Sequence, residues 1–190
     1  MRARHLVAGT TVAVLAAVGL PGVAQAAPVV PAQAVLAAHE FPAGSTGYTQ
    51  KSSIESAASV PSAKTPCTTA TYEAEKATAG GRSTTATARR GSTVLDASVI
   101  DRVVIGKAIE IGRACTDDGP MPGTRLSAPA DLARYRTVFS SNAGGRELIG
   151  FIGVRDSTVR VDAVSVRDRA DFDAFWQTVR AQVAKVERQP

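Results

Sequence analysis

The sequence predicts an α+β domain in which an antiparallel sheet of about five or six strands packs against two or three helices, with one disulfide. Three observations predict this class. Alternating segments joined by turn residues fill 83–100 and 134–166 and indicate strands. Apolar residues recur every three or four positions through 168–187, which indicates a long amphipathic helix. Two cysteines, Cys67 and Cys115, are the number needed for one bridge.

The chain opens with the pattern of an export signal. A short basic start precedes an unbroken apolar run over 6–20, and Ala24 and Ala26 supply the small residues that a signal peptidase recognises. The run is shorter than the ~20 apolar residues that a membrane-spanning helix needs, so an uncleaved anchor fits less well. We therefore predict a cleaved signal peptide over 1–26, a secreted or extracytoplasmic protein, and no membrane span after cleavage.

The segment after the cleavage site differs in composition from the rest. Residues 27–45 form an Ala/Val stretch punctuated by prolines and show little periodicity. Such a stretch is typical of a poorly ordered terminus. We predict a flexible tether over 27–45, followed by a single secreted α+β domain over 46–190.

The first half of that domain reads as strand, helix and hairpin. A polar strand is expected over 48–54, and a helix over 67–79 ends at a Gly-Gly pair and places Cys67 in its first turn. Alternating residues predict strands over 83–88 and 93–100, joined by an Arg-Arg-Gly-Ser turn.

The second half reads as helix, meander and helix. A helix over 103–114 ends at Cys115, and the loop over 117–123 contains two aspartates without the alternating ligands of an EF-hand, so no metal is expected. Alternation predicts three antiparallel strands, over 134–140, 146–154 and 158–166. A change of phase in the last strand predicts a β-bulge near 162–163.

The predicted C-terminal helix, 168–187, should supply much of the core. Asp168 or Asp171 can cap its start, and it carries the one Trp of the chain, Trp176. Phe175 lies in the apolar stripe. Core packing explains these aromatic residues better than a ligand box does.

The two cysteines predict a Cys67–Cys115 disulfide, because an exported chain meets an oxidising compartment. Two unpaired buried thiols are the alternative. A redox role fits poorly, since no C-x-x-C spacing is present.

Charge and motifs exclude several classes of function. The net charge is +5, but no basic run exceeds Arg89-Arg90 and few aromatics interleave, so no nucleic-acid binding is expected. The histidines, His5 and His39, lie in the signal and the tether, which leaves no catalytic triad, metal cluster or cofactor fingerprint. We predict a protein that is not an enzyme and carries neither metal nor cofactor. Paired carboxylates can hydrolyse glycosides without histidine, but candidates such as Asp96 and Asp101 are isolated and lie beside turns or helix starts, where capping explains them.

Three arginines form the one charged constellation that suggests a ligand. Arg134 and Arg136 should share a face of their predicted strand, and Arg160 joins them if the neighbouring strands pair in register. Such a face can hold an anionic envelope component through forked guanidinium contacts. An ordinary solvated face, neutralised by Asp162 and Glu147, is the alternative.

The order of these features, with Pro66-Cys67 opening one helix and Cys115 closing another, resembles small exported domains of mycobacteria and related actinobacteria over residues 46–188. Some of those domains have no known function, and others resemble the extracellular sensor domain of receptor-type Ser/Thr kinases. The resemblance implies an extracytoplasmic sensor-like domain. The kinase-sensor family typically carries a further disulfide, for which this chain has no cysteines.

Three functions follow as hypotheses. The first is a secreted, non-catalytic binding or sensor-like domain of the bacterial cell envelope, holding an unidentified ligand between sheet and helices near Trp176. The second is a structural or protein-interaction protein that has no ligand cavity. The third is a His-independent hydrolase, which requires two carboxylates facing one cleft.

Overall fold

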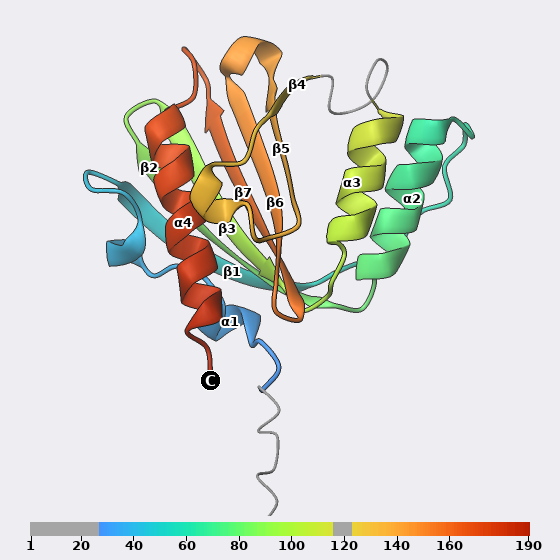
Figure 1. Cartoon of the computed structure of the whole chain (residues 1–190), viewed down its shortest axis with the longest axis horizontal. Coiled ribbons are helices and arrows are strands. Elements are labelled where there is room, and N and C mark those ends of the chain that lie inside the picture. Colours follow the sequence, from blue (N-terminus) through green and yellow to red (C-terminus); the bar gives the residue numbers. More distant parts are fainter. Residues whose placement is uncertain (1–26, 116–122) are drawn as a thin grey trace, which may run out of the picture.

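The computed structural model describes residues 27–115 and 123–190. Within these residues one antiparallel sheet of seven strands carries helices on both faces (Figure 1). The strands are β1 (Thr46–Ile54), β2 (Arg82–Arg90), β3 (Thr93–Ile100), β4 (Gly123–Leu126), β5 (Thr137–Asn142), β6 (Glu147–Val154) and β7 (Ser157–Ser165). The α-helices are α1 (Pro31–Ala34), α2 (Pro66–Thr78), α3 (Ile105–Ala114) and α4 (Phe172–Glu187).

The sheet has the strand order β1-β2-β3-β7-β6-β5-β4. The β2–β3 hairpin closes where Arg90 pairs with Thr93, and the meander from β4 to β7 returns the chain so that β7 pairs with β3. The predicted α+β class with an antiparallel sheet is confirmed. The strand number exceeds the predicted five or six because β4, only four residues long, shows no alternation of apolar and polar residues.

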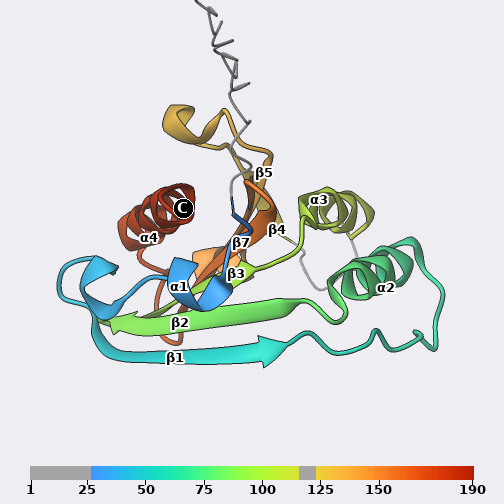
Figure 2. The same ribbon diagram turned by 90° about the horizontal axis from the view of Figure 1, so that it is seen from below.

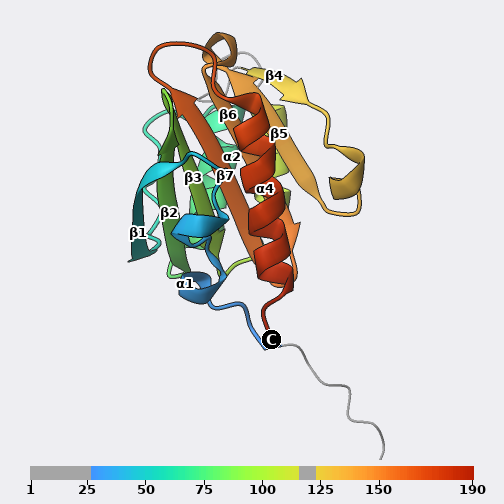
Figure 3. The same cartoon turned by 90° about the vertical axis from the view of Figure 1, so that its left-hand side faces the viewer.

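The main core lies between one face of the sheet and α4, with α1 crossing the same face (Figure 3). Every second residue of the central strands points into it, as Val159 and Val161 of β7 do. From α4, Phe175 and Val179 are fully buried. The apolar stripe read from the sequence is therefore the core face of α4.

A smaller layer covers the other face (Figure 2). Ile105 and Ala108 of α3 pack on Val138 of β5, with Phe151 of β6 at the margin. Helix α2 lies against α3, farther from the sheet. The predicted Cys67–Cys115 disulfide is confirmed and joins the start of α2 to the end of α3, with Cα atoms 4.7 Å apart.

Residues 27–45, predicted as a flexible tether, are part of the folded domain instead. The buried side chain of Gln182 on α4 accepts a hydrogen bond from Leu36 N–H at 3.1 Å and donates one to the Ala34 carbonyl at 2.7 Å. The apolar residues of the segment enter the core; they are Val29, Ala34, Val35, Leu36 and Phe41. Their order comes from contacts with α4 and the sheet, which local periodicity does not report.

Several predicted boundaries change. Strand β5 begins at Thr137, three residues later than predicted, because residues 130–135 form a 3-10 turn and a bend. The bulge near 162–163 is absent from β7, which pairs in continuous register with β3 and β6 through both residues. The change of phase in the sequence has another origin: Val164 points away from the main core and is exposed, and Val166 lies beyond the strand.

Helix α4 begins at Phe172 and is capped by Asp171, one of the two predicted caps, whose carboxylate accepts from Ala174 N–H at 2.9 Å. The predicted signal peptide with Ala24 and Ala26, and the predicted loop except for Gly123, lie outside the described residues. No helix in the part of the chain that the structure describes is both long and apolar enough to cross a membrane.

Candidate functional site

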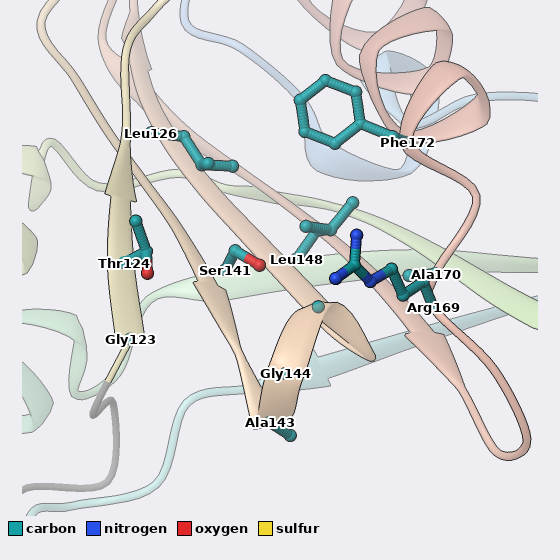
Figure 4. Close-up of a pocket in the computed structure, with 11 residues that line it drawn as sticks. Gly123, Thr124, Leu126, Ser141, Ala143, Gly144, Leu148, Arg169, Ala170 and Phe172 are labelled. Carbon is teal, nitrogen blue, oxygen red and sulfur yellow. The ribbon is translucent and has the colours of Figure 1, made fainter.

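A hollow of about 700 Å³ lies where α4 begins, beside the ends of β4, β5 and β6 (Figure 4). We call it the α4 hollow. Its wall comes from the sheet, from the 3-10 turn Ala143–Gly145 and from the segment that leads into α4. Thr124, Leu126, Ser141 and Leu148 belong to the strands. Arg169, Ala170 and Phe172 complete it from the other side.

The hollow has an apolar part that continues into the aromatic core. Leu148 is buried, while Phe172 is 49% exposed although it lies at the first turn of a core helix. The Phe172 ring meets Trp176 edge to face, with centroids 5.9 Å apart. Trp176 is itself buried against Phe139. Trp176 therefore contacts a residue of the wall without lining the hollow itself. From the sequence it is predicted to lie near a ligand site.

The polar part is dominated by Arg169. The Ala170 N–H donates to the Gly145 carbonyl at 2.8 Å, which ties the segment to the turn. Gly145 has a φ of +89°, and a Cβ there would lie 3.4 Å from the Arg169 Cγ. The glycine thus leaves room for the arginine stem. Figure 4 shows the guanidinium directed across the hollow toward the strands.

Arg169 sets the charge of the α4 hollow. Among the described residues that form the wall, Arg169 is the one charged side chain. Asp171, two residues away, caps α4 and forms an ion pair with Arg90 at 2.8 Å. A guanidinium in a wall without a carboxylate attracts anions.

Of the three arginines predicted to share a face, Arg134 is separated from Arg136. Arg134 lies in the turn before β5 and forms an ion pair with Glu187 of α4 at 2.8 Å. Arg136 lies on the α3 side, since a Cβ on Gly106 would meet its guanidinium at 3.6 Å. The alternation rule does not apply to this pair, because both residues precede the strand.

Arg160, the third of them, lies on β7 and pairs with Asp162 at 2.8 Å. Its guanidinium lies 5.4 Å from the centre of the Phe151 ring. Arg169 was not among the sequence-predicted site residues. Its one sequence signal is its place just before the aromatic start of the C-terminal helix.

A second, polar hollow of about 490 Å³ lies on β1, β2, β3 and β7, on the side of these strands that points away from the main core. Asp96 and Asp162 are direct cross-strand partners and both line it. Burial raises the pKa of Asp162, although the Arg160 charge acts in the opposite direction. Arg160 also lines the hollow. The remaining wall consists of hydroxyl groups and a lysine, from Thr49, Lys51, Thr85, Thr87 and Ser98.

Replacing Asp162 with asparagine should stabilise the protein at neutral pH. The pKa of Asp162 is raised in the folded state, so ionisation above that pKa costs folding free energy that the neutral amide avoids. We expect a gain of up to about 1 kcal/mol at pH 7, the scale of a cross-strand pair. The gain should vanish as the pH falls below the ordinary pKa of an aspartate, where both states are protonated.

Urea unfolding of wild type and Asp162→Asn at pH 7 and pH 3 measures this difference. Asp168→Asn, a change of the same charge at an exposed position, is the matched control and should show no such gain. A variant that is less stable than wild type at pH 7 contradicts the prediction and makes the Arg160 ion pair the larger effect.

The described residues contain no cluster of three or more His, Cys, Asp or Glu side chains able to hold a metal ion. The α4 hollow combines apolar side chains, one cation and backbone groups of a turn. These groups are able to make apolar, ionic and hydrogen-bonding contacts with a small molecule.

Comparisons with known proteins identify the fold and no family. The chain matches no protein-family model and no curated protein. The structure is similar to the X-ray structure of an uncharacterised protein from Mycobacterium smegmatis, described as an Rv0999 ortholog, with a TM-score of 0.50 and 13% sequence identity. The match covers 84% of this chain and 97% of that one. The chain therefore shares its fold with an uncharacterised mycobacterial protein, and the likeness to kinase sensor domains stays a prediction.

Proposed function

We propose that this protein is a secreted, non-catalytic binding module of the bacterial cell envelope and that its ligand occupies the α4 hollow. One observation carries the proposal. A hollow of about 700 Å³ has the half-exposed ring of Phe172 and the side chain of Arg169 together in its wall. The volume lies within the roughly 300–1,000 Å³ of small-molecule sites.

The wider setting of the site agrees with this function. The Cys67–Cys115 bridge fits an oxidising compartment, as does the export signal expected from the sequence. The contacts of the wall also favour binding over structural support. Phe172 meets Trp176 edge to face and keeps 49% of its surface exposed beside Arg169, which leaves its ring accessible to a ligand.

Fluorescence of Trp176 tests the proposal without a label. Trp176 is the one tryptophan of the chain and contacts Phe172, so a molecule that packs on Phe172 should change its emission. We expect a saturable shift when the protein is titrated with an extract of bacterial cell envelope. The absence of a shift with polar and organic fractions alike contradicts the proposal.

A pair of variants assigns the shift to the hollow. Thr124 is exposed and lines the hollow, so Thr124→Tyr should obstruct it and abolish the shift. Ser127 is also exposed but lies outside this wall, and Ser127→Tyr should respond like wild type. A shift that survives in both variants places the ligand elsewhere.

A second candidate function, glycoside hydrolysis, is favoured by one observation. Asp96 and Asp162 face one hollow, and the raised pKa of Asp162 suits a general acid beside a second carboxyl group. Its test is sugar release from envelope polysaccharide, with the release lost in both Asp96→Asn and Asp162→Asn. No release by the wild-type protein leaves the pair as a feature of the sheet surface.

A further inference from the structure

The charge of the α4 hollow selects for acidic ligands. Among the described residues the wall carries one guanidinium and no carboxylate, so its net charge favours an anionic ligand over a cationic one. Its side-chain hydroxyls, on Thr124 and Ser141, lack the carboxylate and amide groups that hold a neutral sugar from several sides. A carboxylate or phosphate, in contrast, accepts two parallel N–H bonds from one guanidinium.

The apolar residues select for a chain attached to that acidic group. Leu126, Leu148 and Phe172 come from three different elements and line the same hollow as Arg169 (Figure 4). A small inorganic anion would satisfy the arginine and leave the exposed surface of Phe172 and Leu126 in water. An apolar chain beside the anion removes that surface from water, which is favourable by about 25 cal/mol per Å².

The backbone that carries Arg169 is tied to the 3-10 turn before a ligand arrives. The Arg169 stem lies over Gly145, and the neighbouring Ala170 N–H is bonded to the Gly145 carbonyl. Phe172 is fixed by its edge-to-face contact with Trp176. A guanidinium and an apolar surface in one hollow favour a ligand that has both an acidic group and an apolar chain.

We infer that the α4 hollow binds an acidic amphiphile, a molecule with a single carboxylate or phosphate group joined to a short apolar chain. This inference rests on the proposed function and specifies its ligand class. Arg169 contacts the acidic group, and Leu126, Leu148 and Phe172 contact the chain.

Calorimetric titration with four probes tests the ligand class: octanoate, octyl phosphate, octan-1-ol and inorganic phosphate. We expect both acidic octyl compounds to bind at least about tenfold more tightly than octanol, since a bond to a charged group contributes that much. They should also bind more tightly than inorganic phosphate. Octanoate against octyl phosphate then distinguishes a fatty-acid ligand from a phosphate ester.

Two matched variants identify the arginine. Arg169→Gln should remove the advantage of the acidic probes over octanol, while Arg167→Gln, an equal change of charge at a nearby exposed position outside the wall, should keep it. The inference is overturned if the two variants have equal effects or if octanol and octanoate bind equally. It is also overturned if no octyl probe binds. Inorganic phosphate binding as tightly as octyl phosphate overturns the requirement for a chain. The envelope-extract titration decides the proposed function separately, because an extract that shifts Trp176 while these probes fail leaves a ligand of another class.

Discussion

Replacing Phe175 with alanine should lower the free energy of unfolding by about 3–5 kcal/mol. Its ring is fully buried at the centre of the main core, edge to face with Phe139 at 6.2 Å and with Trp176 at 5.0 Å. The site is poorly able to close around the gap. Gly150 of β6 lies beneath the two phenylalanines, where a Cβ would meet Phe139 at 2.7 Å. A backbone strand cannot move into the space that a ring leaves.

Urea unfolding followed by circular dichroism measures the loss. Phe172→Ala is the matched control, because the same ring is removed from the same helix at a position that is 49% exposed. It should cost far less, since little burial and no closed cavity are involved. Equal losses in the two variants contradict the assignment of Phe175 to the centre of the core.

The sequence predicted those elements whose apolar pattern matches the period of the structure. The stripe through 168–187 faces the sheet as α4, and strand 93–100 has the predicted ends. Both elements bury one face, so periodicity and burial agree. The disulfide was predictable for a different reason, since two cysteines allow one pairing.

The sequence did not predict elements that are ordered by distant contacts. Residues 27–45 have no period because they cross the core as irregular chain, held by Gln182 from the far end of the protein. The polar Gln182 interrupts the apolar pattern of its helix, yet it is fully buried. A buried amide that bonds two backbone groups has no signature in local sequence.

The candidate site also depends on contacts between residues that are distant in the sequence. Thr124, Leu148 and Arg169 come from a short strand, a core strand and a connecting segment, and the sheet order brings them together. The predicted arginine face was argued from spacing within one strand and failed when Arg134 and Arg136 proved to lie before that strand. The spacing of residues predicts a shared face only within one helix or strand.

Replacing both cysteines, as Cys67→Ala with Cys115→Ala, should lower the free energy of unfolding by about 4 kcal/mol. The bridge closes a loop with a sequence separation of 48, and losing it restores conformational freedom to the unfolded chain. Mutation is a cleaner test than reduction, because Cys115 is almost completely buried and shielded from a reductant. Urea unfolding with hydrogen exchange measures the global loss and its distribution.

The distribution of that loss should follow the two layers of the fold. Helix α2 packs mainly against α3, so its amides should lose most protection when the bridge is absent, while β3, β7 and α4 keep theirs. No residue of α2 or α3 lies in the described wall of the α4 hollow. The Trp176 response to envelope extract should therefore persist in the double variant under native conditions. A response that disappears together with α2 protection would show instead that the two faces of the sheet are coupled and that the disulfide supports the binding site from behind.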